Sequence, residues 1–230
     1  NAGFGWTGPI FGRRYRLQLS RTFGDFNFTE GLVDFRNYLN FKRWVTFATQ
    51  FLTVTRFGQG SGNFWNYWGG PYFLRGYDAD SFEGVEECAG RNFSYGSCPV
   101  RDQLIGSSVA LFRSELRFPV ITELQIGFLG NFPPIDAVLF FDGGLAWNDH
   151  VCIDNGMPVF DDDCADPRDI KLVWRREPDQ NPLFYRTPLF SYGIGLRANV
   201  FFAILRLDYA FPLSRPDRSG VFSISFGPSF

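Results

Sequence analysis

Lysine, methionine and histidine are almost missing from this chain of 230 residues. Only Lys42 and Lys171 are lysines among the 22 basic residues, and the other 20 are arginines. His150 and Met157 are the single histidine and the single methionine. One histidine is too few for a zinc site with mixed histidine and cysteine ligands. The formal net charge of −2 gives no bulk attraction to nucleic acid, so we expect no nucleic-acid partner.

Long apolar runs and helical spacing are missing as well. The longest obvious apolar run, residues 200–205, is far shorter than the roughly 18–20 residues of a membrane-spanning helix. Apolar residues do not recur at the i, i+3, i+4, i+7 spacing of an amphipathic helix. No N-terminal segment is typical of a signal peptide, and the chain begins at Asn1 rather than Met. A processed protein and a part of a longer one both fit this start.

Motifs that carry chemistry do not occur. We find no GxSxG, HExxH, phosphate-binding loop or nucleotide fingerprint, so we expect no enzymatic activity and no cofactor. Residues 161–163 are three aspartates, with Asp154 and Asp166 nearby, and such a cluster could hold calcium. The ordered spacing of an EF-hand is missing, so a solvated acidic loop is favoured and we expect no metal site. His150 is expected to be a solvated loop residue.

The four cysteines form two close pairs, Cys88 with Cys98 and Cys152 with Cys164. Their spacing does not match a CxxC metal pattern, and each pair lies in a polar segment rich in Gly, Asp and Asn. Two disulfides within loops are the simplest interpretation, and they place those loops in an oxidising compartment. Free thiols in a cytosolic protein are the alternative.

Alternation with a period of two residues runs through most of the chain, which indicates β-strands. It is cleanest in residues 221–230, which begin at Val221 and place Phe222, Ile224, Phe226 and Phe230 on one face. About eight strands are expected, longer than the usual five or six residues. They cover residues 13–23, 27–41, 43–57, 112–118, 137–147, 192–200, 203–211 and 221–230. The facing of the 43–57 strand stays undecided, because its alternation is poor.

We expect a single all-β domain over residues 1–230, a transmembrane antiparallel β-barrel. The polar faces carry opposite charges and aromatic residues gather near the strand ends, which argues against a soluble sandwich. Long connections at 58–106 and 148–187 alternate with short ones near 42, at 119–133 and near 201. Bacterial outer-membrane barrels have long extracellular loops and short periplasmic turns. Both cysteine pairs then lie outside the cell and both termini lie in the periplasm.

Four stretches resemble motifs of one family and occur in the same order as in that family. They are GGPYFLRGYD (69–78), LFRSELRFP (111–119), VLFFDGGLAW (138–147) and YGIGLRANVFFAILRLDYAFPL (192–213), followed by an aromatic terminal strand ending in Phe230. They resemble the BamA/TamA superfamily of outer-membrane assembly and translocation barrels, also called the bacterial surface antigen family. The resemblance covers residues from about 69 to 230.

The resemblance implies a role for the RGY motif of Arg75, Gly76 and Tyr77. In the family this loop folds back into the lumen and its arginine pairs with acidic residues on the two following strands. By resemblance these are Glu115 and Asp142. Alternation independently places both carboxylates on the polar faces of their strands. A guanidinium has five donors and can bridge two carboxylates. The cluster could also do no more than plug and brace the barrel.

The number of strands differs from the family pattern. Family members usually close sixteen strands behind periplasmic POTRA repeats, whereas eight strands and no POTRA repeat are found here. Two alternatives stay open: a small closed barrel, or the C-terminal half of a sixteen-stranded one. A small barrel would leave little room for a loop folded inside it.

The resemblance implies insertion, assembly or translocation of polypeptides in the bacterial outer membrane, without catalysis. Residues 221–230 are then the candidate seam strand, where an exposed edge can pair with a client strand. The expected partners are outer-membrane lipids and either client polypeptides or partner proteins of the outer membrane or periplasm. The alternatives are a structural anchor or exporter for a fused or partner domain, and an accessory subunit of a larger complex.

Overall fold

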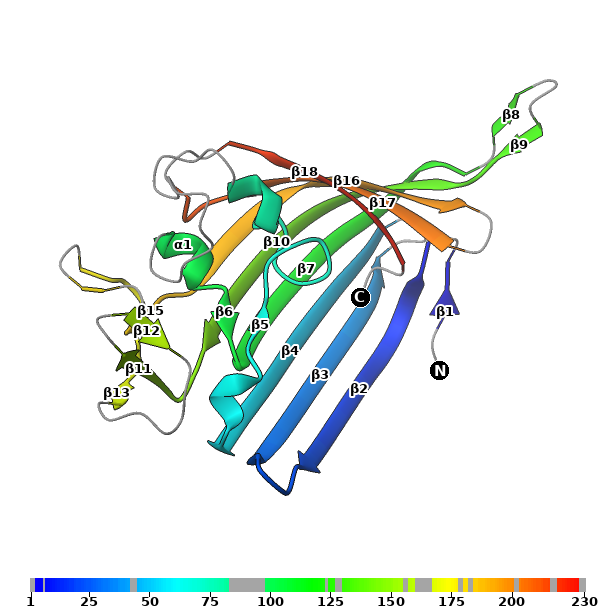
Figure 1. The fold of residues 1–230 in the computed structure, drawn as a ribbon. Helices are drawn as coiled ribbons and strands as arrows, with labels where there is room; N and C mark the ends of the chain where they lie inside the picture. The colour runs from blue at the N-terminus through cyan, green and yellow to red at the C-terminus, as the bar shows by residue number, and fades with distance from the viewer. Residues whose placement is uncertain are drawn as a thin grey trace.

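Most of the described residues form β-strands in the computed structural model. The structure describes residues 3–5, 7–41, 45–82, 98–122, 124–126, 130–154, 157–159, 167–177, 180–181, 184–200, 203–215 and 219–227. One curved antiparallel sheet has the order β1-β2-β3-β4-β7-β10-β16-β17-β18 (Figure 1). Its strands are β1 Gly3–Phe4, β2 Pro9–Arg21, β3 Asn27–Phe41, β4 Val45–Gln59, β7 Ser108–Ile121, β10 Ile135–Trp147, β16 Leu189–Val200, β17 Ala203–Pro212 and β18 Val221–Phe226.

The eight strands expected from alternation are confirmed, with shifts of a few residues at their ends. Each of the eight pairs with the next of the eight along the chain, so β4 pairs with β7 across the 60–107 connection and β10 pairs with β16 across the 148–188 connection. The registers are regular over long stretches, for example from Asn27 opposite Gln59 to Phe41 opposite Val45. A period of two residues was therefore a sufficient signal for the whole sheet.

The two faces of the sheet differ in the way the alternation predicts. In β7 the side chains of Arg113, Glu115 and Arg117 are buried on the concave face, whereas Phe112 is 45% exposed on the convex face. The facing of β4, which the sequence left undecided, follows the same rule: Ala48 is buried and Phe51 is exposed. The convex face is apolar across β10, β16 and β18, where Leu139, Ile194, Ile224 and others are exposed.

The connections lie at the two ends of the strands as expected. The long ones, 60–107 and 148–188, leave from one end, and the short ones between β7 and β10 and between β16 and β17 lie at the other, together with β1 and the end of β18 (Figure 1). The connections carry short strands: β5 Asn66–Tyr67, β6 Ile105–Gly106, β8 Leu124–Ile126, β9 Gly130–Phe132, β11 His150–Asp154, β12 Met157–Val159, β13 Pro167–Asp169, β14 Lys171–Leu172 and β15 Tyr185–Arg186.

In the described part of the chain, helical structure is confined to three short turns. They are the 3-10 helices η1 Ser61–Asn63 and η2 Ala79–Phe82 and the α-helix α1 Pro99–Asp102. Within the described ranges, no helix has the length and apolar character that crossing a membrane would require.

The sheet is open, which corrects one of the two alternatives drawn from the sequence. A small closed barrel requires β18 to pair with the first strands, but among the described residues β18 pairs only with β17. The physical reason lies on the concave face, where the described residues of the 60–107 connection pack (Figure 1). The interior of an eight-stranded barrel is only wide enough for side chains, so a closed sheet of this size has no room for the loop.

A glycine on the concave face allows the closest packing in the sheet. An ideal Cβ at Gly193 would overlap the Tyr209 carbonyl oxygen and would lie 2.5 Å from Phe140 Cζ and 2.9 Å from Ala210 Cα. We predict that Gly193→Ala lowers the free energy of unfolding by about 1–3 kcal/mol, because overpacking forces the backbone or the ring to move. Urea titration of the folded, heat-modifiable band on gels measures this change.

The matched control is Gly31→Ala in β3. A Cβ at Gly31 would meet no atom within 4 Å, so the substitution should change stability by less than about 0.5 kcal/mol. Equal effects of the two substitutions would show that the close contact at Gly193 is not what limits packing.

Candidate functional site

The RGY loop is a tight hairpin-like turn on the concave face of the sheet. The Gly70 N–H donates to Leu74 O at 2.9 Å and the Leu74 N–H donates to Trp68 O at 3.2 Å. Gly70 and Gly76 have φ values of 104° and 84°, in the region that favours glycine over residues with a Cβ. Gly70 precedes the motif and Gly76 is its central residue, and both allow the chain to turn beside the wall.

Apolar side chains of the loop hold it against the wall. Leu74 and Tyr77 have no exposed surface, and Trp68 is 6% exposed. They form one cluster with wall residues of β4, β7 and β10, including Val54, Leu111 and Ala146. Burial of these side chains stabilises the loop on the wall, since each large apolar side chain contributes about 1.5–3 kcal/mol when buried.

Hydrogen bonds at the ends of the loop also hold it against the wall. The Tyr67 hydroxyl donates to Tyr77 O at 2.6 Å, and the Tyr77 hydroxyl donates to Phe190 O at 2.8 Å. The indole N–H of Trp68 donates to Gly106 O at 2.9 Å. Each buried aromatic polar group therefore has an acceptor, which buried Tyr and Trp side chains usually need.

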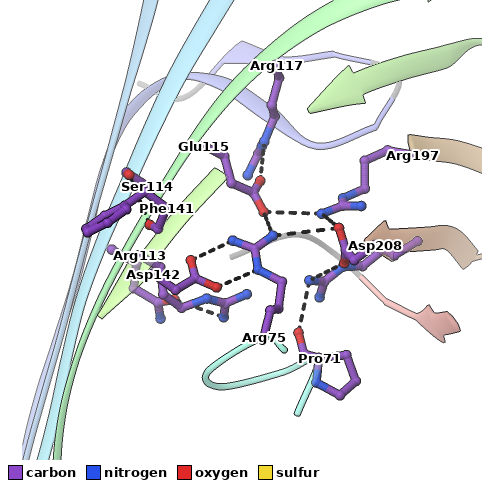
Figure 2. Close-up of polar contacts among 12 residues, drawn as sticks. Pro71, Arg75, Arg113, Ser114, Glu115, Arg117, Phe141, Asp142, Arg197 and Asp208 are labelled. Carbon is purple, nitrogen blue, oxygen red and sulfur yellow. Dashed lines mark hydrogen bonds and ion pairs between the residues drawn. The ribbon is translucent and has the colours of Figure 1, made fainter. Parts of the chain in front are cut away.

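The guanidinium of Arg75 bridges two carboxylates from neighbouring strands (Figure 2). Its Nε and Nη2 donate to Asp142 Oδ2 and Oδ1 at 2.6 and 2.7 Å, and its Nη1 donates to Glu115 Oε1 at 2.6 Å. All three side chains are completely buried. The Cζ atom of Arg75 also lies 3.7 Å from the centroid of the Phe140 ring. The structure thus brings Arg75, Glu115 and Asp142 together in the arrangement that the resemblance implied.

Further charges of the wall extend this contact into a network. Arg117 donates to the second oxygen of Glu115 at 2.8 Å, and Arg197 lies 3.3 Å from the first. Arg197 also pairs with Asp208 at 2.7 Å, and Asp208 lies 3.8 Å from Arg75 (Figure 2). The strands β7, β10, β16 and β17 therefore all reach the loop through one set of ion pairs, which we call the arginine network.

The electrostatics of the network favour a fixed loop. Burial opposes the charge of Arg75, but Asp142 and Glu115 outweigh it and raise the pKa of its guanidinium above the ordinary value. Loss of one partner would leave a buried charge uncompensated, which costs more than the pair itself is worth. The arrangement can clamp a loop or hold a wall in register, and it needs no proton transfer to do so.

Asp208, Arg197 and Arg117 were not among the candidate site residues. Alternation had placed the charged side chains of these strands on the polar face, and that was the signal available. What the sequence could not show is that the loop passes over the positions where these side chains meet. Arg206 pairs with Asp208 at 3.6 Å and belongs to the same set.

Other candidate residues are placed as follows. The terminal strand β18 is one edge of the sheet and contains the candidate seam residues Val221, Phe222, Ile224 and Phe226. Phe230 lies outside the described residues. Cys98 and Cys152 are buried and neither is a free thiol. Cys88 and Cys164 lie outside the described residues, so the two pairings stay predictions.

The acidic residues considered for calcium are only partly described. Residues 161–163 and Asp166 lie outside the described ranges, and Asp154 ends β11, which begins at His150. Within the described ranges no group of His, Cys, Asp and Glu side chains could hold a metal ion.

Substitution of Arg75 tests the clamp. We predict that Arg75→Ala lowers the free energy of unfolding by about 3–5 kcal/mol, because Asp142 loses its bidentate partner while buried and Glu115 keeps only Arg117 and Arg197. Arg75→Lys keeps the charge and loses the bidentate contact, so it should fall between the wild type and Arg75→Ala. Urea titration of the heat-modifiable band measures all three proteins. The control Arg13→Ala removes an exposed arginine with a 3.3 Å bond to Asn37, and an equal loss there would contradict the clamp.

Asp78, directly after the motif, makes the loop sensitive to pH. Burial raises the pKa of its carboxyl from 3.8 to about 6, and Asp80 and Asp208 add to the shift. The folded chain therefore takes up a proton below pH 6 that the unfolded chain takes up only near pH 4. The stability from this group is complete below about pH 4 and is lost as the pH rises through 6.

We predict that Asp78→Asn, which mimics the protonated form, stabilises the protein at pH 7.5 and not at pH 4. The difference in urea midpoint between wild type and variant, measured at steps from pH 4 to 7.5, should grow with pH. A difference independent of pH would show that Asp78 does not titrate in this range.

Comparison with known proteins agrees with this geometry. The model of the Omp85 superfamily domain matches residues 7–230, which is nearly the whole chain. No curated protein matches the sequence. The match covers the sheet as well as the RGY loop, and it is consistent with the C-terminal barrel region of BamA/TamA-type proteins. The chain belongs to the Omp85 superfamily, a family of outer-membrane proteins.

Proposed function

We propose that this chain forms the wall of an outer-membrane β-barrel that inserts or translocates other polypeptides at the free edge of β18. The family points to insertion and translocation in general. The observation that carries the proposal for this chain is the terminal strand: β18 has six residues and pairs on one side only among the described residues. An edge of this kind exposes N–H and C=O groups that a client strand can pair with.

The convex face supports a position in the lipid bilayer. Tyr192 and Ile194 on β16 and Phe222, Ile224 and Phe226 on β18 are 47–60% exposed, and Tyr209 on β17 between these strands is 39% exposed. A contiguous apolar surface across several strands is unfavourable in water and suits lipid. In the proposed orientation the long connections face the cell exterior and the termini face the periplasm. The predicted disulfides of Cys88 with Cys98 and Cys152 with Cys164 would then brace the exterior loops.

The open edges support a barrel of more strands than the sheet contains. In lipid every backbone polar group needs a partner, and an open sheet edge leaves a row of them unpaired. At the opposite edge, most of β2 is exposed on both faces, including Arg14, Tyr15 and Arg16. We infer that further strands complete the barrel, as in the sixteen-stranded members of the family. The concave face then lines a lumen in which the RGY loop sits.

The arginine network gives this barrel a rigid wall beside a mobile edge. Arg75 ties the loop to β7 and β10, and Asp208 adds β17, but β18 contributes no charged residue to it. The terminal strand can therefore move without breaking an ion pair of the network. A barrel that only anchors or exports a partner domain has no need of a movable edge, and neither does a passive subunit of a larger complex.

A reversible lock on β18 separates these roles. Leu207 and Ile224 lie opposite each other on β17 and β18, so Leu207→Cys with Ile224→Cys can form a disulfide. We predict that the oxidised protein loses most of its insertion of a client barrel into proteoliposomes, because β18 can no longer leave β17. A reductant should restore it.

The control lock joins Thr49 and Ser114, which lie opposite each other on β4 and β7 inside the wall. Thr49→Cys with Ser114→Cys should leave insertion unchanged in both redox states. Full insertion by the oxidised Leu207–Ile224 pair would rule out the edge mechanism and favour the anchor.

A further inference from the structure

The edge of β18 has a defined set of backbone groups that no strand pairs with in the described part of the chain. The Gly227 N–H donates to Ile204 O at 2.9 Å, directly beside the Leu205–Phe226 pair. This bond shows that Leu205 and Phe226 are a non-hydrogen-bonded pair of the antiparallel ladder. Hydrogen-bonded and non-hydrogen-bonded pairs alternate along such a ladder. Phe222, Ile224 and Phe226 therefore turn their N–H and C=O groups away from β17. These three residues form the edge that a further strand would meet.

One of these backbone acceptors already accepts a hydrogen bond from the loop on the concave face. The hydroxyl of Tyr72, in the RGY loop, donates to the Phe226 carbonyl oxygen at 2.9 Å. The Tyr72 ring also lies 4.0 Å from the position that a Cβ on Gly227 would take. The loop thus contacts the end of the terminal strand at an acceptor that strand pairing would use.

Wall arginines hold Tyr72 in this position. Arg113 Nη1 donates to Tyr72 O at 2.9 Å, and Arg206 Nη2 donates to the preceding carbonyl, Pro71 O, at 3.1 Å. The Arg206 guanidinium also lies 6.0 Å from the centroid of the Tyr72 ring. Arg206 is directly opposite Ser225, so it brings the tip of the loop beside β18.

The same short segment carries both the contact to β18 and the clamp. Pro71 and Arg75 lie on one turn of the loop (Figure 2), and the Phe73 N–H closes this turn on Gly70 O at 3.1 Å. The buried Arg75 fixes the turn to β7 and β10. The position of Tyr72 is therefore set by the arginine network rather than by β18.

We propose that Tyr72 is a latch on the free edge of β18, which blocks full strand pairing until its hydroxyl leaves the Phe226 carbonyl. The partner it controls is an extended peptide strand that would bond to the edge groups of Phe222, Ile224 and Phe226. This inference rests on the proposed function for its biological meaning, but the latch itself is a property of the free protein. A strand can bond to the first two residues while the latch is closed, and it reaches Phe226 only by displacing Tyr72.

The test removes one oxygen atom. Tyr72→Phe keeps the ring and the two main-chain bonds to Arg113 and Arg206 and deletes the hydroxyl bond. Hydrogen–deuterium exchange of peptides covering residues 221–227, in the purified protein in detergent, reports opening of β18. A hydrogen bond of ordinary net strength predicts exchange about 2- to 10-fold faster than in the wild type, with no change for peptides of β3.

Tyr192→Phe is the matched control. Tyr192 is 47% exposed, close to the 53% of Tyr72, and its hydroxyl makes no hydrogen bond within the described residues. Exchange in β18 should be the same as in the wild type. Heat-modifiability of both variants confirms that the sheet and the arginine network stay folded.

The outcomes distinguish the latch from the proposed function. Unchanged exchange of residues 221–227 in Tyr72→Phe overturns the latch, whatever the protein does with clients. Faster exchange with faster client insertion supports both the latch and its control of the edge. Faster exchange with no effect on insertion supports the latch as a structural contact and overturns its regulatory role. Loss of insertion in the oxidised Leu207–Ile224 lock separately tests the edge mechanism.

Discussion

The buried guanidinium of Arg75 is the interaction on which the arrangement of the whole inner face depends. A loop of about 48 residues between β4 and β7 would not keep one position on a sheet through apolar contacts alone, since those contacts are not directional. The bidentate bond to Asp142 and the bond to Glu115 fix its orientation, because such charge-assisted bonds are directional. Because those acids lie on adjacent strands, the same bonds also fix the register of the wall beneath the loop.

This constraint divides the sheet into a rigid part and a loose part. Ion pairs cross the concave face from β7 to β17. Separation of these strands would expose a buried charge or leave it without its partner. At β18 the ladder is short, the face carries serines rather than charges, and one edge has no strand beside it within the described residues. The contact of Tyr72 with Phe226 is the point where the rigid part touches the loose one. The division is what a barrel needs if it is to open at one place and stay intact elsewhere.

Sequence patterns were enough for the strands and for their two faces, because a period of two residues survives in any strand with one apolar side. The pairing of Arg75 with Glu115 and Asp142 followed from the family resemblance together with that alternation. Asp208 and Arg197 were missed as members of the network. Asp208 meets Arg75 only where the 48-residue connection crosses the sheet, and Arg197 joins through Asp208 and Glu115. Closure of the sheet could not be predicted from the sequence either, because eight strands fit a small barrel or part of a large one. The loop packed on the concave face excludes the small closed barrel. The hydrogen bond from Tyr72 to Phe226 could not be predicted, because no sequence pattern relates the loop to the terminal strand.

The central claim is that Arg75 and the wall acids are coupled, and a double-mutant cycle between Arg75 and Asp142 tests it most directly. The free energies of unfolding of the wild type, Arg75→Met, Asp142→Leu and the double variant give the coupling free energy. A buried bidentate pair predicts a coupling of at least about 2 kcal/mol, with the double variant less destabilised than the sum of the single ones. Additive losses, with a coupling near zero, would mean that the two side chains do not hold each other and would contradict the account.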